Sequence, residues 1–594
     1  MQSYLPGHLQ VISVSAEDKT PKIICDPAHE ELVLPDTHGN VAGIIHKLQA
    51  AGVMTIPQEN LKDIEDLLKL ESYEQHTEDT LKKFDTLLNS ATFETKQYKK
   101  LRFLGDMLAD RAGNDWFTLK FLEKLVEKNI KFEINLSNHD LEFLRYYRLV
   151  KKGLVKKEIS KKLFSTNIDS HQSPSLYIFI AMYQKMNLIE TSQIIDLVER
   201  CYLPFLKLPQ VTFDEEKYCE QAASSLKPQA IMYTHAPCGT EITQALHKQF
   251  CNLPTVNPET VIDLMDAHDS IQESFQEELK KDTFWERNTI THSMQDNRID
   301  YDSNGIVIPD PTQHPLEYIT WNRYKQYISC SKNYELTVIH GHVGKNTGAA
   351  HHHQQTWQLE NVKGHNLDDK NEFGKSLYSS FGEYTVYTSP SYIPSFKKLH
   401  NALQKRKDEK ESKSGTIVMD DPIDSAGMIL YESAKNLLKF FMKNNLRAQY
   451  KTVKDAITIA TKAIEDPKVI NATEAINNSI MAVSQLEAEV TSSIRVKKYI
   501  TRIIGALCVI AGGCVLAAGV FGIPFSLGIS IGLAAGLGSG LIAFGLAMIS
   551  KSFYYPEYKL NQPCKLFSKP LITKDSPTDD EESKNSKKKN RSVL

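Results

Sequence analysis

The sequence contains few cysteines and no closely spaced pair of them. Its nine cysteines are scattered, and none stands in a Cys-x-x-Cys arrangement. Thiol-based zinc and redox centres need such pairs, and an odd number of scattered cysteines does not make a disulfide framework. We therefore expect a reducing compartment and no thiol-based metal site.

Two further features are missing. The first ten residues lack a basic region followed by an apolar run, so no secretory signal peptide is predicted. The 70 Lys and Arg residues are balanced by 73 Asp and Glu residues, and this gives no basic excess for binding nucleic acid. What is present, 594 residues of which 41% are hydrophobic and 24% charged, predicts a folded protein of about two to four domains.

Short apolar runs, each followed by polar residues, organise the N-terminal part of the chain. They are Glu31–Pro35, Leu101–Leu104, Ile130–Leu136, Ala230–Tyr233 and Leu336–Ile339. Stretches with helical spacing alternate with these runs, which predicts an α/β fold. Because open α/β sheets hold their ligands at the carboxyl ends of the strands, we expect a functional site where these runs end.

The residues that follow the runs suit metal ions and phosphate. In chain order they are Asp36 and His38; Asp106 with Asp110 and Arg111; Asn138 and His139; His235; and His340 and His342. Carboxylate, amide and imidazole ligands without thiolate suit Mn²⁺, Fe or Zn²⁺, and the planar guanidinium of arginine suits phosphate. Any one of these groups alone would be weak evidence, but five in succession indicate metal-dependent phosphate chemistry.

This constellation resembles the calcineurin-like metallophosphoesterases, and within them the phosphoprotein phosphatase branch. That family carries the motifs GDxHG, GDxVDRG, GNHE, a later HG or HA, and a terminal GH. The segment Trp321-x-Arg323 also resembles its second phosphate-binding arginine. The longer second motif, GDMLADRAGN, is similar to that of the Wip effector phosphatases, which Legionella injects into host cells. The resemblance covers roughly residues 30–395.

Some positions depart from the family pattern. Pro35 and Ser137 stand where the family has glycine, Ala112 replaces another glycine, and Asp140 replaces glutamate. None of these changes removes a metal ligand, so an active site is expected.

The resemblance implies a β-sandwich flanked by helices and a site that holds two divalent ions, of which Mn²⁺ is the first expectation. The first ion would be bound by Asp36, His38 and Asp106. The second would share Asp106 and be bound by Asn138, His235 and His342. Two ions about 3.5–4 Å apart activate a shared hydroxide for attack on a phosphomonoester.

The resemblance also assigns the groups that act on the substrate. His139 would be the general acid, and Asp110 would hold its imidazole in the required tautomer. Arg111 and Arg323 would neutralise the phosphate in the transition state. The substrate would be a phosphoprotein, with phosphotyrosine and phosphoserine or phosphothreonine both open.

Two alternatives of different kinds remain at this point. The same fold could act on a nucleotide or a dinucleoside polyphosphate, since fold does not determine substrate. Alternatively, the domain could bind a partner as part of a membrane scaffold. Cys238 is expected to be a packing residue, because no C-x5-R signature accompanies it, and His351–His353 are expected to lie in a solvated loop. His340 could support the metal site or be an ordinary strand histidine.

The domain boundaries follow from changes in composition. We expect a catalytic domain over 1–400, with 141–225 inserted as a helical cap, and a charged linker over 401–423. A helical stalk or bundle would occupy 424–500. The tail, 552–594, has the composition of a disordered segment. Its acidic cluster followed by lysines makes it a candidate type IV secretion signal.

Residues 501–551 are the most apolar part of the chain. Ile503–Ser550 contains no charged residue and is long enough for two membrane spans of about 20 residues each. Basic residues flank both ends, which favours a transmembrane hairpin with both ends in the cytosol. A buried soluble hairpin is the alternative. In the Legionella context we expect a protein secreted into the host cell and anchored in a host membrane, its catalytic domain facing the cytosol. The sequence does not indicate the oligomeric state.

Overall fold

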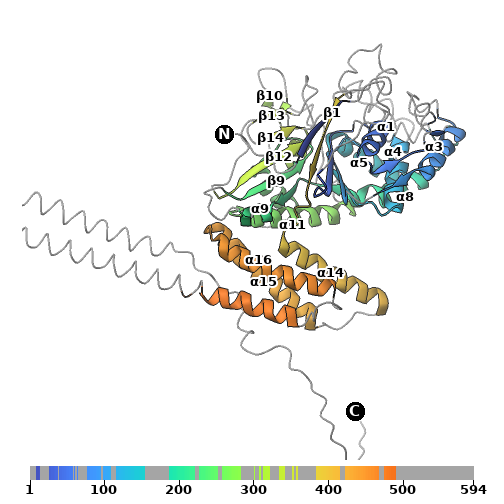
Figure 1. Ribbon diagram of the computed structural model, residues 1–594. Coiled ribbons are helices and arrows are strands. Elements are labelled where there is room, and N and C mark those ends of the chain that lie inside the picture. The colour runs from blue at the N-terminus through green and yellow to red at the C-terminus, as the bar shows by residue number, and fades with distance from the viewer. Residues whose placement is uncertain are drawn as a thin grey trace, which may run out of the picture. The chain divides into compact units, whose positions relative to one another are not determined.

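The computed structural model divides the chain into two compact units (Figure 1). The first contains the described residues up to Pro394 together with Met442–Ala448, and the second contains Ser395–Phe441 and the described residues from Gln449 onward. The structure describes residues 8–13, 26–37, 39, 41–57, 59–60, 63, 76–94, 98–108, 115–153, 183, 186–220, 227–251, 257–281, 300–301, 307–308, 312, 314–321, 333–341, 351–353, 356–358, 383–414, 422–466, 474–489 and 492.

A six-stranded sheet forms one half of the first unit. Its strands, in spatial order, are β1 (His8–Ser13), β15 (Glu383–Ser389), β2 (Glu31–Leu34), β5 (Lys100–Phe103), β6 (Phe132–Asn135) and β7 (Leu206–Lys207). The last four strands run parallel, whereas β15 is antiparallel to both of its neighbours. Because the parallel strands are neighbours, their carboxyl ends lie along one edge of the sheet.

A five-stranded sheet forms the other half. Its strands, in spatial order, are β13 (His351–His353), β14 (Thr356–Gln358), β12 (Glu335–His340), β9 (Gln229–Thr234) and β8 (Gln210–Phe213). The central strands β14, β12 and β9 run parallel. Two short pairs complete the strands of the described residues: β3 (Met54–Thr55) with β4 (Thr92–Phe93), and β10 (Asp300–Tyr301) with β11 (Val307–Ile308). His351–His353, expected in a loop, thus form an edge strand of this sheet.

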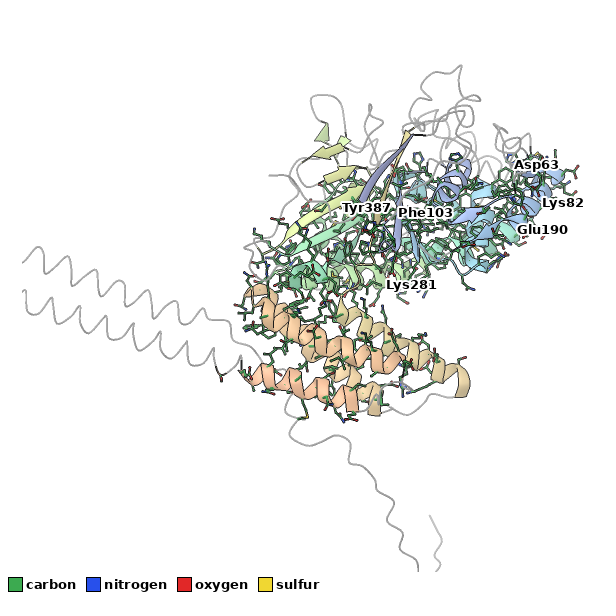
Figure 2. The ribbon with its side chains drawn as sticks, in the orientation of Figure 1. Asp63, Lys82, Phe103, Glu190, Lys281 and Tyr387 are labelled. Atoms are coloured by element: carbon green, nitrogen blue, oxygen red, sulfur yellow. The ribbon has the colours of Figure 1, made fainter. Side chains whose placement is uncertain are left out.

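The two sheets share one apolar core. A single buried cluster draws residues from both of them: Val33, Leu104 and Tyr387 from the first sheet or the loops at its edge, and Ile231, Tyr233 and Ile339 from the second. Figure 2 shows Phe103 and Tyr387 inside the packed side chains, while Lys82 and Glu190 lie at the periphery. The expected mixed α/β fold is confirmed.

A buried ion cluster also joins the sheets. Arg102 on β5 is only 1% exposed, and its guanidinium lies 2.9 Å from the Glu133 carboxylate and 3.4 Å from that of Glu31. The same guanidinium lies over the Tyr233 ring of the second sheet, 4.1 Å from its centroid. A buried arginine needs such partners, since an isolated charge in the interior is costly.

Helices cover the sandwich in two groups. One group contains α1 (Val41–Ala50), α3 (Glu78–Ser90), α4 (Asp115–Glu127), α5 (Asn138–Lys151) and α8 (Thr191–Cys201). Within it, α4 contacts α1, α3 and α8. The other group contains α9 (Glu215–Glu220), α10 (Glu241–Cys251), α11 (Val261–Leu279) and α13 (Pro315–Trp321), and here α11 packs on α10 and β8.

The interval 141–225, expected to be a helical cap, differs from that expectation. After α5, α8 and a short 3-10 helix, η2 (Leu203–Phe205), it supplies β7 to the first sheet and β8 to the second. In β8 the side chains of Val211 and Phe213 are buried, while Gln210 and Thr212 are half-buried. This period of two is that of a strand, but four residues are too few to reveal it in the sequence. The part of the interval between 154 and 182 lies outside the described residues.

The second unit is helical. It contains α14 (Ser395–Ser414), most of α15 (Pro422–Lys443), most of α16 (Arg447–Glu465) and a helix over 474–489. Residues 401–414, expected to belong to a linker, continue α14. Their charges support the helix: Arg406 and Lys410, one turn apart, bind Asp424 at 3.0 and 2.7 Å. Charged residues spaced by a helical turn therefore join two helices here rather than marking a linker.

The segments expected as a membrane hairpin, 501–551, and as a tail, 552–594, lie outside the described residues. Among the helices that are described, none combines the length and the apolar character needed to cross a membrane.

Candidate metal centre

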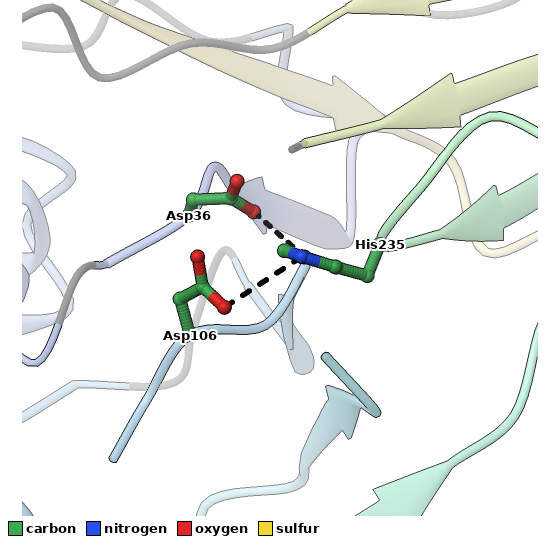
Figure 3. Close-up of side chains that lie close together, drawn as sticks. All are labelled: Asp36, Asp106 and His235. Carbon is green, nitrogen blue, oxygen red and sulfur yellow. Dashed lines mark ion pairs between the residues drawn. The ribbon is translucent and has the colours of Figure 1, made fainter. Parts of the chain in front are cut away.

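Three buried side chains with metal-binding groups meet where strands of the two sheets end. Asp36 follows β2, Asp106 follows β5 and His235 follows β9, and one ligand atom from each lies within 4.8 Å of the others. His235 Nδ1 is 3.2 Å from Asp36 Oδ1, and its Nε2 is 3.6 Å from Asp106 Oδ1 (Figure 3). Two carboxylates and an imidazole suit Mn²⁺, Fe or Zn²⁺, so this buried triad can hold a metal ion.

Backbone contacts lock the two aspartate loops together. The Thr37 hydroxyl and the Gly39 N–H both donate to the Asp106 carbonyl oxygen, each at 2.8 Å. Asp106 itself adopts a φ of 55°, a left-handed conformation that is uncommon for a residue other than glycine. Strained backbone of this kind persists where the surrounding contacts impose it, and it is frequent at functional sites.

Two glycines allow the loops to come this close. Gly105 has a φ of 121°, and a Cβ there would lie 2.7 Å from His235 Nδ1. Gly341, directly after β12, lies so near the first aspartate that a Cβ would fall 1.8 Å from Asp36 Oδ1. The end of β12 therefore reaches the triad. The neighbouring His340 is buried, with its Nδ1 2.6 Å from the Gly341 carbonyl oxygen.

The start of α5 brings an amide and a second imidazole to the same place. Asn138 Oδ1 lies 2.9 Å from His235 Nε2, and His139 is buried beside it in the sequence. Ser137 caps the helix, since its hydroxyl oxygen accepts from the Asp140 N–H at 3.0 Å. Such a cap fixes where the first helical residues begin.

The charges of the triad act strongly on one another. Burial by itself would lower the pKa of His235, but the Asp36 and Asp106 carboxylates outweigh it and raise that pKa to about 9. The imidazole is therefore protonated at neutral pH when no metal ion is bound, and its positive charge compensates the two carboxylates. A bound cation would compensate them in its place.

Two further buried groups have shifted pKa values. Burial raises the pKa of Asp140 to about 6, against the opposing effect of hydrogen bonds from Tyr202 and Ser137. Burial lowers the pKa of Lys47, on α1, to about 7, while the charge of Asp36 acts in the other direction. The sequence analysis singled out neither Lys47 nor Tyr202, and no local pattern around either residue indicates its burial.

Half of the residues predicted from the sequence are described, and the structure brings four of these together: Asp36, Asp106, Asn138 and His235. The fifth, His139, is buried next to Asn138 in the first turn of α5. The others lie outside the described residues: His38, Asp110, Arg111, Arg323 and His342. The helix that precedes Arg323, α13, is tied to the site, because the Ala236 N–H donates to the Ile319 carbonyl oxygen at 3.0 Å.

Cys238 packs close to the site without the character of a nucleophile. Its Sγ lies 3.7 Å from Met232 Sδ and 3.8 Å from Thr234 Oγ1. Burial raises the pKa of this thiol far above its ordinary value, so no thiolate is available at neutral pH. Its expected role as a packing residue is confirmed.

The structure defines an α/β protein with a sandwich of two mixed sheets, in which two carboxylates and an imidazole are buried where strands of both sheets end. Residues 100–375, a little under half of the chain, match the family described as WipA-like, phosphatase domain. This match confirms the resemblance to the Wip-type phosphatases.

Among solved structures, the chain is similar to the phosphatase domain of the Legionella effector WipB. The identity is 21%, the TM-score is 0.43, and the match covers 53% of this chain and 99% of the other. A comparison with curated proteins found no match.

Proposed function

We propose that this chain is a two-metal-dependent phosphatase that hydrolyses phosphomonoesters on proteins. The observation that carries the proposal is the buried triad of Asp36, Asp106 and His235, supplied by both sheets. Asp106 and His235 lie within the residues that match the WipA-like phosphatase domain. His38 would complete one ion site, and Asn138 and His342 the other, with Mn²⁺ as the first metal to test. Two bound ions supply Lewis acidity and lower the pKa of a water molecule so that it becomes a nucleophile at neutral pH.

The protein's own groups then bind the substrate and move a proton. His139, buried at the start of α5, would donate its proton to the leaving oxygen of the ester, with Asp110 orienting its ring. Arg111 and Arg323 would bind the phosphate oxygens through their planar guanidinium groups. The three side chains of the triad are buried, and electrostatic interactions are stronger in such surroundings than in bulk water.

The test is a hydrolysis assay on the full-length protein with Mn²⁺, using phosphotyrosine and phosphoserine or phosphothreonine peptides side by side. His139→Ala should reduce kcat by a factor of about 10²–10⁴, which is the usual contribution of a general acid. Asp106→Asn should abolish turnover, because it removes a charge from the ligand that both ions would share. Cys238→Ser is the matched control and should retain activity, because it replaces a buried packing residue. EDTA should abolish turnover and Mn²⁺ should restore it.

Either of two results would overturn the proposal. One is undiminished turnover in Asp106→Asn and His139→Ala. The other is hydrolysis of dinucleoside polyphosphates or cyclic nucleotides at a higher kcat/KM than any phosphopeptide. A full biological effect that survives both substitutions would favour the scaffold alternative instead.

We also propose that residues 501–551 anchor the protein as a membrane hairpin and that it acts as a secreted effector on host phosphoproteins. The support is the absence of charge over Ile503–Ser550, the basic residues on both flanks, and the resemblance to effector phosphatases. Release of the full-length protein by alkaline carbonate extraction would refute the anchor.

A further inference from the structure

A carboxylate beside the candidate metal centre is enclosed by hydroxyl groups. Asp140, in the first turn of α5, is completely buried. Its Oδ2 accepts from the Ser137 hydroxyl at 2.7 Å and its Oδ1 from the Tyr202 hydroxyl at 2.6 Å. Hydrogen bonds to an ionised acceptor are short and strong. The two bonds to this carboxylate therefore hold in place the helical turn that carries Asn138 and His139.

Tyr202 comes from a different part of the chain. It ends α8, where its N–H donates to the Val198 carbonyl oxygen at 3.2 Å, and it directly precedes η2 and β7. The backbone near β7 is itself fixed to the strand before α5, because the Leu136 N–H donates to the Lys207 carbonyl oxygen at 2.8 Å. The start of α5 is therefore held by backbone pairing and by the Tyr202 side chain.

The ring and the hydroxyl of Tyr202 make different contacts. The ring is fully buried and packs edge-on against Phe143 of α5, at 5.5 Å between centroids and 73° between planes. Only the hydroxyl reaches Asp140. Replacing Tyr202 with phenylalanine would therefore keep the ring packing and remove only the hydrogen bond from Tyr202 to the Asp140 carboxylate.

We propose that Tyr202 and Asp140 are positioning residues of the metal centre. Through their hydrogen bond they fix the first turn of α5, and this turn places the Asn138 amide oxygen 2.9 Å from His235 Nε2. Groups that orient metal ligands from outside contribute about 10–100-fold to metal affinity. The expected change in metal affinity rests on the proposed two-metal function. The expected effect on the first turn of α5 does not depend on a metal ion.

The chain offers a matched control on the same pair of helices. Tyr147, two turns further along α5, donates its hydroxyl to the Glu199 carboxylate of α8 at 3.0 Å. Tyr147→Phe removes the same atom and the same type of bond between α5 and α8. It leaves the first turn of α5 untouched.

Mn²⁺ binding to the full-length protein, measured by titration calorimetry, should be about 10–100-fold weaker in Tyr202→Phe and within twofold of wild type in Tyr147→Phe. Excess Mn²⁺ should restore the kcat of Tyr202→Phe. In the metal-free protein, hydrogen exchange at the first turn of α5 should be faster in Tyr202→Phe only. Asp140→Asn, which keeps the shape of the side chain, should behave like Tyr202→Phe.

Equal losses in Tyr202→Phe and Tyr147→Phe would overturn the proposal, since both would then act through general stability. Unchanged Mn²⁺ affinity and unchanged exchange in Tyr202→Phe would also overturn it. Failure of the wild-type protein to bind Mn²⁺ would refute the proposed function instead, and the exchange measurement on metal-free protein would still decide whether Tyr202 positions the turn.

Discussion

The ion cluster between the sheets should control the stability of the first unit, and Glu133→Gln tests this directly. Burial by itself would raise the pKa of Glu133, but the charges of Arg102 and Lys100 outweigh it and hold the pKa at about 2, against 4.5 for an ordinary glutamate. Each pKa unit corresponds to about 1.4 kcal/mol, so the ionised carboxylate contributes on the order of 3 kcal/mol.

The sign of the pH dependence follows from the lowered pKa. The folded protein binds the proton less tightly than the unfolded chain, so the contribution is complete above about pH 4.5 and is lost as the pH falls towards 2. At pH 7, Glu133→Gln should therefore lower the free energy of unfolding by about 3 kcal/mol. The gap between variant and wild type should narrow steadily as the solution is acidified through this window.

Removing the other partner gives a second measurement of the same cluster. Arg102→Met leaves the Glu31 and Glu133 carboxylates without the cation that lies between them, which should cost about 3–5 kcal/mol. The cost of Glu133→Gln should be much smaller in the Arg102→Met background, because contacting residues are energetically coupled.

Tryptophan fluorescence suits this assay, because all four tryptophans lie before residue 395 and so report on the first unit. Urea unfolding of full-length protein at several pH values supplies the free energies. A Glu133→Gln effect that does not change between pH 7 and pH 3 would refute the reasoning. So would simple additivity in the double variant.

Two other predictions concern the site. Gly341→Ala would place a Cβ 1.8 Å from Asp36 Oδ1. The Mn²⁺ affinity measured by calorimetry should therefore fall at least about tenfold, and the free energy of unfolding should fall by about 1–3 kcal/mol. A Mn²⁺ affinity equal to that of wild type would contradict the packing seen at Gly341. Because the pKa of His235 is raised to about 9, Mn²⁺ binding at pH 7 should release a proton and tighten as the pH rises towards 9. Calorimetry in buffers of different ionisation enthalpy measures this release, and identical heats in all buffers would contradict it.

The strands that carry the site could be predicted because their signal is local. Glu31–Leu34 and Gln229–Thr234 are runs of apolar residues that lead directly into Asp36 and His235. A short window of sequence contains both the strand and the ligand that follows it.

Other features depend on contacts between distant residues. The bond from Tyr202 to Asp140 spans 62 positions, and no pattern around either residue announces it. Likewise, residues 401–414 of α14 were expected to belong to a linker because their charged residues outnumber their apolar ones. The pairing of Arg406 with Asp424 of another helix is visible only in three dimensions.

The triad has a mechanical consequence for the sandwich. Asp36 and Asp106 follow strands of one sheet and His235 follows a strand of the other, so the two proposed ions that share Asp106 would form a removable cross-link between the sheets. A ligand that binds only the folded state stabilises it by about 2.7 kcal/mol at a hundred times its dissociation constant. Metal supply would then set how firmly the sheets are held together, and chelation would loosen the shared core around Val33 and Tyr233.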